Sequence, residues 1–259
     1  MKLSNFLLAI ITFVVSLIFL PKLPAQIPMH WNVRGEVDNL VAKETGIWFI
    51  PAMILAISLL FGFLPMFDPK KDKYKLFKKE WDIMQTGIIG FLVYLQFITI
   101  YISLNPQTSI LPLMFMGLGV LFVLIGNFLS KIRQNYFIGI KTPWALADED
   151  NWNKTHRYGS WCFVIAGIIA LAEAYFIWYA PIVILGSVLL TAFLPFVYSF
   201  LLFKKAESKM KLVYLGIGIS FLIVTILRFA TAEDTWLCDH GLWVKHGHPD
   251  NPAPLEECR

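Results

Sequence analysis

The feature that most constrains this chain is a series of long apolar runs that contain almost no charged residues. A helix needs about 20 apolar residues to cross a hydrocarbon core of ~30 Å, and only helices or closed barrels satisfy the backbone in lipid. The runs are continuous rather than alternating, which favours helices over barrel strands. The qualifying runs are 5–20, 46–65, 83–104, 110–130, 160–179, 182–203 and 212–230. The sequence therefore predicts an all-α, polytopic transmembrane helical bundle of about seven spans.

Composition agrees with this interpretation, because 57% of the 259 residues are hydrophobic and only 15% are charged. A soluble domain of this length needs far more polar surface. The 9 Trp and 22 Phe residues suit aromatic belts at the membrane interfaces. We expect the lipid bilayer as the main partner and no nucleic acid, since there is neither a basic helix nor a basic strand with interleaved aromatic residues.

The distribution of basic residues predicts the orientation in the membrane. Sixteen Lys and Arg residues fall on the side of the N-terminus and six on the other side. Since cytoplasmic loops carry the excess of Lys and Arg, we expect the N-terminus inside, and the segment 22–45 and the tail 231–259 outside. A cleaved signal peptide is the alternative for the first span, although Leu23-Pro24-Ala25 is a poor small-residue cleavage site.

The outer loop, 22–45, is too polar to cross and too rich in proline to form one helix. We expect turns at Arg34-Gly35 and at Val37-Asp38. Trp31 and the prolines favour a loop that packs down onto the outer face of the bundle.

The outer loop also concentrates polar groups, among them His30, Asn32 and Asp38. His30 and Asp38 have the chemistry of a base and its orienting carboxylate, which keeps a membrane enzyme as the weakest hypothesis. The chain contains no HExxH, GxSxG, CxxC or phosphate-binding glycine loop. We therefore expect no enzyme, and a loop in which these side chains hold the turns together.

The inner segment, 127–159, carries most of the remaining polar chemistry. Asp148 is a predicted N-cap for a helix that starts at Glu149. The side chains of Trp152, Thr155, His156 and Gly159 then share one face of this helix. This face either docks on the bundle or holds a ligand; alternatively, the helix lies at the interface, anchored by Trp152, Lys154 and Arg157.

Polar residues within the spans are costly in lipid and are often functional. Glu173 lies in the fifth span, Gln96 in the third, and Arg228 near the outer end of the seventh. Glu173 is either a carboxyl that reaches the outer interface, a partner of Arg228, or the coupling group of a small transporter or exporter. The lack of a convincing internal repeat argues against transport.

The tail contains Cys238 and Cys258, and Cys162 lies in an apolar span, where inert packing is expected. An outer location favours a Cys238–Cys258 disulfide. Metal binding with the nearby histidines and free thiols are the alternatives, and we expect no metal because the spacings match no zinc pattern.

The inner segment resembles the signature of the SdpI family, which comprises bacterial membrane immunity proteins against a secreted toxin. The signature residues are Asn127, Asn135, Gly139, Ile140, Lys141, Thr142, Pro143, Trp144, Leu146, Glu149, Trp152, Thr155, His156, Arg157 and Gly159. Lys141 replaces the family's usual Arg, and Ala145 replaces its usual second Thr.

The outer loop resembles the N-terminal domain of unknown function that precedes this signature in many family members. The matching residues are Leu23, Pro24, Ile27, Pro28, His30, Trp31, Asn32, Gly35, Asp38 and Lys43. The resemblance divides the chain into a two-span unit (1–65), a four-span SdpI-like unit (66–203), an added span (204–230) and an outer tail (231–259).

The resemblance implies a multi-pass protein of the bacterial cell (inner) membrane, without a cofactor. It also implies a role in protection against a secreted antimicrobial peptide or toxin. In some family members, a transcriptional repressor is captured at the inner face, so a repressor is a candidate partner inside.

Overall fold

The computed structural model describes residues 3–177, 179–206, 220–224, 226, 235–246 and 256. The chain forms two compact units, Met1–Phe203 and Lys204–Arg259. Each unit is described below by itself.

The described part of the chain contains six helices that are long and apolar enough to cross a membrane. They are Leu3–Lys22, Lys43–Phe67, Lys71–Leu104, Ile110–Leu129, Glu149–Phe176 and Ala180–Lys205. These helices confirm an all-α polytopic bundle of about the expected number of spans. Most of the predicted seventh span, 212–230, lies outside the described residues, and so does Arg228.

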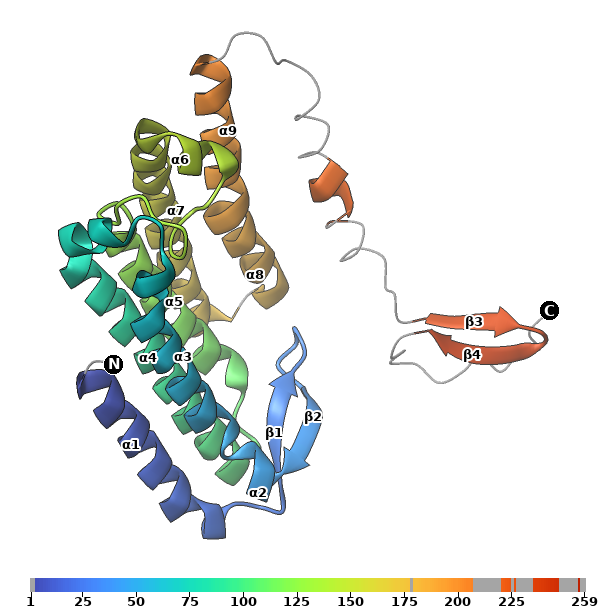
Figure 1. The fold of residues 1–259 in the computed structure, drawn as a ribbon. Coiled ribbons are helices and arrows are strands. Elements are labelled where there is room, and N and C mark those ends of the chain that lie inside the picture. Colours follow the sequence, from blue (N-terminus) through green and yellow to red (C-terminus); the bar gives the residue numbers. More distant parts are fainter. Residues whose placement is uncertain are drawn as a thin grey trace. The chain divides into compact units, whose positions relative to one another are not determined.

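The elements of the first unit follow the apolar runs, with short polar insertions between them. The N-terminal part comprises α1 (Leu3–Phe19), η1 (Leu20–Lys22), β1 (Gln26–Trp31), β2 (Val37–Ala42), α2 (Lys43–Gly46) and α3 (Phe49–Phe67). The rest comprises η2 (Lys71–Phe77), α4 (Lys78–Leu104), α5 (Ile110–Leu129), α6 (Pro143–Ala147), α7 (Glu149–Phe176), α8 (Ala180–Val188), the π-helical turn η3 (Leu189–Phe193) and α9 (Leu194–Ala206). Figure 1 shows the β1–β2 hairpin and α6 at opposite ends of the long helices.

Small residues bring α5 and α7 into close contact. A Cβ atom added to Gly126 would lie 2.8 Å from the Ser160 carbonyl oxygen, and one added to Gly119 would lie 2.9 Å from the Gly167 carbonyl oxygen. Such backbone proximity gives helices in lipid their van der Waals contact. The two helices therefore form a tight pair that flanks the inner segment.

A buried polar contact joins α4 to α1 and to the turn between α2 and α3. The Gln96 amide nitrogen donates to the Ser16 hydroxyl at 2.9 Å and to the Ile47 carbonyl at 3.1 Å. Gln96, which the sequence marks as a polar residue within a span, therefore ties α4 to these two segments rather than facing lipid.

The outer loop forms an antiparallel hairpin, β1–β2, that packs down onto the bundle as predicted. Ile27 is fully buried against Ile47 and Ile100, while Trp31 packs on Ile98 and Ile102. The apolar side chains of β1 thus anchor the hairpin to α4.

The predicted turn at Val37-Asp38 is wrong, because Val37 already begins β2. The Asn32 side-chain oxygen accepts the backbone N–H groups of Arg34 at 2.9 Å and Glu36 at 3.1 Å. Gly35, with φ +80°, completes this tight turn. The asparagine side chain reverses the chain before residue 37, so the next residues are free to pair as a strand.

The second unit contains the hairpin formed by β3 (Thr235–Asp239) and β4 (Leu242–His246). His240 and Gly241 both have positive φ, as a two-residue hairpin turn requires. Cys238 is disulfide-bonded, whereas Cys162 is buried and free. Cys258 lies outside the described residues, so the predicted disulfide between Cys238 and Cys258 stays a prediction.

Candidate functional site

The inner segment folds into a compact loop, 131–142, followed by the short helix α6 and the start of α7. Asn135, which is fully buried, organises the loop. Its side-chain oxygen accepts the N–H groups of Phe137 and Ile138 at 2.9 and 2.8 Å, and its amide donates to the carbonyls of Arg133 and Ile138 at 2.9 and 3.0 Å. Because one asparagine satisfies four backbone groups, the loop has a fixed shape without regular secondary structure.

His156 closes this loop from α7. Its ring stacks on Trp152 with centroids 3.9 Å apart. The Nε2 atom accepts the Ile140 N–H at 3.0 Å, so Nδ1 carries the proton and donates to the Trp152 carbonyl at 2.8 Å. The imidazole is therefore neutral, and both of its nitrogens are used.

Gly139 makes the approach of His156 to the loop possible. Its φ of +117° suits only glycine, and a Cβ atom there would collide with His156 Nε2. The Trp152 indole nitrogen donates to the Ile132 carbonyl at 2.9 Å. Loop, indole and imidazole therefore form one interlocked group.

A second set of buried side chains ties the segment to α9. Thr142 caps α6 by accepting the Ala145 N–H at 3.1 Å, and its hydroxyl lies 2.6 Å from that of Ser199. Ser199 donates to the Asn151 side-chain oxygen at 2.7 Å, and Thr155 donates to the same oxygen at 3.0 Å. Since the Ser199 proton goes to Asn151, Thr142 must donate to Ser199.

A third set, which the sequence did not predict, ties the segment to the end of α3 and to η2. Asp68 is buried, and one of its oxygens accepts both the Tyr74 hydroxyl and the Tyr136 N–H at 2.9 Å. Gln134 donates to the carbonyls of Ala145 and Leu146 at 2.7 and 3.0 Å. Asp68 comes three residues after the second apolar run and directly after α3, and this position at the end of a span was the one signal in the sequence. We call the interlocked residues the inner knot: Asp68, Tyr74, Gln134, Asn135, Gly139, Thr142, Asn151, Trp152, Thr155, His156 and Ser199.

The predicted face of α7 is confirmed as a docking face, because Trp152, Thr155 and His156 are all 0% exposed. The alternative in which Trp152 anchors an interfacial helix is therefore wrong. Asp148 is the N-cap of α7, as predicted, and accepts the N–H groups of Asp150 and Asn151 at 3.1 Å.

The other signature residues lie around the inner knot rather than in it. Pro143 begins α6, and Trp144 packs on three phenylalanines of α9, Phe196, Phe200 and Phe203. Exposed Lys141 donates to the Phe137 carbonyl at 3.0 Å. Exposed Glu149 lies 2.8 Å from the Lys73 ammonium, which links α7 to η2.

Asn127 and Arg157 point away from the inner knot. Both side chains are exposed and line a cavity of about 270 Å³ between α5 and α7, together with Ser130, Ser160 and Trp161. Asn127 donates to the Val123 carbonyl at 2.8 Å. Arg157 contacts no carboxylate among the described residues, so its guanidinium remains accessible at the inner end of the bundle.

At the opposite end, the polar residues of the outer loop hold the hairpin together. The His30 Nδ1 atom lies 2.6 Å from an Asp38 oxygen, and both side chains are exposed. The pair bridges β1 and β2, while Asn32 bonds the Glu36 carboxylate at 2.8 Å. This geometry favours the interpretation in which these residues shape the loop.

A model of the SdpI/YfhL protein family matches residues 131–199, and a domain of unknown function, DUF1648, matches residues 7–55. Residues 131–199 are thus similar to the SdpI/YfhL family, and we call them the SdpI domain. Immunity protein SdpI of Bacillus subtilis (strain 168) is 28% identical over 205 residues, which cover 79% of this chain and 96% of that protein. No solved structure matches.

The SdpI domain contains most of the inner knot, whereas Asp68 and Tyr74 lie outside it. The match begins directly after α5 ends at Leu129 and stops at Ser199, the residue of α9 that bonds Thr142 and Asn151. The DUF1648 match covers most of α1, the outer hairpin and the first part of α3. The chain is therefore a multi-pass bacterial membrane protein with the two elements expected of this family.

The SdpI domain also contains Glu173, which closes the connection between α7 and α8. The carboxylate is buried and accepts the Tyr179 N–H at 2.8 Å, just after Ile177 turns the chain in a left-handed conformation. This contact favours a structural role for Glu173 over the predicted extension to the outer interface.

Proposed function

We propose that the chain is a membrane immunity protein of the SdpI type, which protects its cell against a secreted antimicrobial peptide or toxin. The observation that carries the proposal is the match of residues 131–199, which contain most of the inner knot, to the SdpI/YfhL family. A relative that has immunity in its name matches over nearly its whole length, which supports the same role.

The inner knot supports a mechanical part in this function. Its side chains bond one another and the backbone, and they join η2 and the start of α7 to the signature loop and α9. A closed network of this kind is rigid. Its effect is to hold Lys141, Glu149 and Arg157 in fixed positions on the face predicted to be cytoplasmic, where a soluble partner such as a transcriptional repressor would contact them.

The outer hairpin offers a contact surface for the toxin. Val33, Val37 and Leu40 are 56, 44 and 54% exposed, although they are apolar. Exposed apolar groups on a hairpin suit the apolar side chains of an antimicrobial peptide. Toxin binding at the hairpin would bias the helices between two states because the toxin binds one state more tightly.

The test uses the toxin against which the Bacillus subtilis relative gives immunity. Toxin-sensitive cells that express this chain should survive, and survival should fall at least tenfold with the double variant Val37→Ser/Leu40→Ser. Asn39→Ser, an exposed polar change on the same strand, is the matched control. Equal survival of cells with and without the chain, at matched membrane levels, would refute the proposed function.

The inner face has a separate test. The membrane protein should co-purify with a repressor after toxin addition, and Arg157→Gln should reduce the amount recovered while protection persists. Recovery that is unchanged by Arg157→Gln would remove this residue from the signalling surface.

A further inference from the structure

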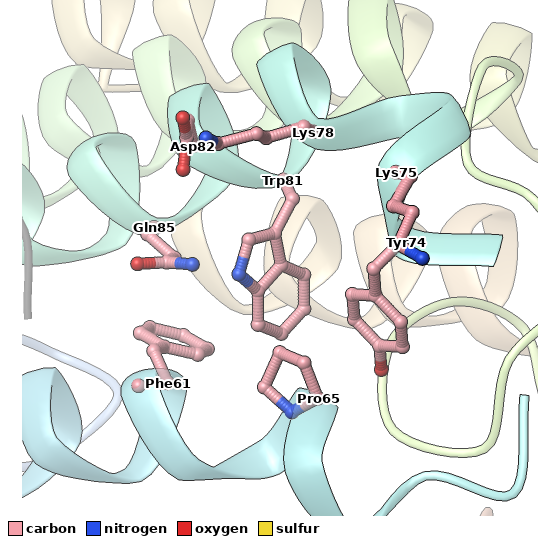
Figure 2. A pocket seen from close by; sticks show the side chains of 9 residues that line it. Phe61, Pro65, Tyr74, Lys75, Lys78, Trp81, Asp82 and Gln85 are labelled. Atoms are coloured by element: carbon pink, nitrogen blue, oxygen red, sulfur yellow. The ribbon is translucent and has the colours of Figure 1, made fainter. Parts of the chain in front are cut away.

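A cavity of about 370 Å³ lies at the inner end of the first unit, between the end of α3 and the start of α4. Figure 2 shows its walls, which are formed by the rings of Phe61, Pro65, Tyr74 and Trp81. The proposed immunity function does not use this cavity. Its largely apolar walls suit a ligand that has a hydrocarbon part.

The polar group in this cavity is the amide of Gln85. This side chain is only 6% exposed, yet it forms no hydrogen bond with any residue that the structure describes, and Figure 2 shows it lining the cavity. Because the amide lines the cavity, it can exchange hydrogen bonds with a polar group of a ligand that enters there.

Charged side chains form the rim. Lys75 and Lys78 supply ammonium groups and Asp82 supplies a carboxylate, toward which Lys78 extends in Figure 2. Lys75 is paired with Asp72 at 2.9 Å, but both side chains are about four-fifths exposed, so water already weakens this pair. An incoming phosphate can therefore compete for the Lys75 ammonium.

The surrounding sequence adds positive charge at this level of the membrane. The segment 68–82 contains six lysines and four carboxylates, and it directly follows a span on the side predicted to be cytoplasmic. Basic clusters at this position attract anionic lipids, because the inner leaflet carries negative charge.

We propose that the cavity binds an anionic phospholipid of the inner leaflet, of the phosphatidylglycerol type. The phosphate lies between Lys75 and Lys78, and a head-group hydroxyl donates to Asp82. The Gln85 amide donates to an ester carbonyl, and one acyl chain runs along Phe61.

This site is continuous with the inner knot through Tyr74. The Tyr74 ring forms a wall of the cavity, and its hydroxyl donates to Asp68, which in turn accepts the Tyr136 N–H of the signature loop. A bound lipid thus restricts the residue that connects η2 to the loop. Lipid binding therefore stabilises the SdpI domain, whether or not the domain confers immunity.

The experiment measures retention of lipid by the full-length protein, purified in detergent and analysed by native mass spectrometry. The protein is titrated with phosphatidylglycerol or with phosphatidylethanolamine of the same acyl chains. The double variant Lys75→Gln/Lys78→Gln removes the rim charges, and Lys71→Gln/Lys79→Gln removes two exposed lysines of the same segment that do not line the cavity.

We expect phosphatidylglycerol to bind more tightly than phosphatidylethanolamine and to raise the unfolding temperature. Each rim lysine should contribute roughly fivefold to its affinity, so the rim variant should lose about 25-fold and the control pair much less. Gln85→Leu should fold normally without lipid, since the substitution breaks no hydrogen bond to a described residue. Phosphatidylglycerol should no longer raise the unfolding temperature of this variant.

Three results would overturn the proposal. The first is equal affinity for the two lipids, and the second is an equal loss of phosphatidylglycerol affinity in the rim and control variants. The third is a Gln85→Leu protein whose unfolding temperature phosphatidylglycerol raises as much as it does for the unchanged protein. None of these readouts involves toxin, so a failed lipid site and a failed immunity role are separate outcomes.

Discussion

At the scale of the residue, His156 shows how much of this molecule depends on single hydrogen bonds. Its two ring nitrogens bond backbone groups from two different segments, and its ring covers Trp152. No charged atom and no free nitrogen remains for general acid or base chemistry. Thr155 and Asn151 are similarly engaged by their neighbours, so the family signature here consists mostly of residues that bind the chain to itself.

Replacing His156 by Phe should destabilise the protein by about 2–4 kcal/mol. Phenylalanine keeps the stacking on Trp152 but leaves the buried N–H of Ile140 without an acceptor. Thermal unfolding in detergent measures the change, with Lys141→Ala as the exposed control. A His156→Phe protein that is as stable as the control would show that the hydrogen bonds contribute nothing.

At the scale of the element, the close contact of α5 and α7 depends on glycines. Glycines elsewhere in the bundle have different surroundings. A Cβ atom at Gly126 would meet the Ser160 carbonyl at 2.8 Å, whereas one at Gly90 of α4 would meet nothing within 4 Å. The same substitution therefore has opposite consequences in two helices of one protein.

Gly126→Ala should separate α5 from α7 and cost about 1–3 kcal/mol. Gly90→Ala should be neutral or stabilising by up to about 1 kcal/mol, because alanine favours helices and meets no obstacle. Unfolding temperatures of the two variants, measured side by side, give the comparison. A Gly126→Ala variant as stable as Gly90→Ala would mean that the helices are not in backbone contact.

The α7–α8 connection gives a prediction that separates immunity from transport. Glu173→Gln keeps a side-chain oxygen that can accept the Tyr179 N–H, so toxin survival and unfolding temperature should change little. Glu173→Leu loses the acceptor and should destabilise the protein by about 1–3 kcal/mol. If Glu173→Gln folds normally but abolishes protection, the carboxylate titrates in the function, and the transporter hypothesis gains support.

At the scale of the whole molecule, the features with strong local signals were predictable from the sequence. The apolar runs gave the spans, and the spacing of Trp152, Thr155 and His156 gave their common buried face. Asp68 and Ser199 were missed because their partners come from distant segments. Asn127 was grouped with the signature by its position alone, although the helical rotation of α5 turns it outward.

The orientation of the bundle follows from charge, and two exposed residues at opposite ends test it. Val33 lies in the turn of the outer hairpin and is 56% exposed, while Leu76 lies in η2 among the basic residues and is 70% exposed. Sixteen basic residues against six predict that Leu76 lies inside and Val33 outside. In a Cys238→Ser/Cys258→Ser background, where buried Cys162 is the one remaining thiol, Val33→Cys should react with an impermeant maleimide in intact cells. Leu76→Cys should react only after the membrane is opened. The reverse pattern would place the inner knot and the lysines at the rim of the cavity outside, where neither a repressor nor an inner-leaflet lipid could reach them.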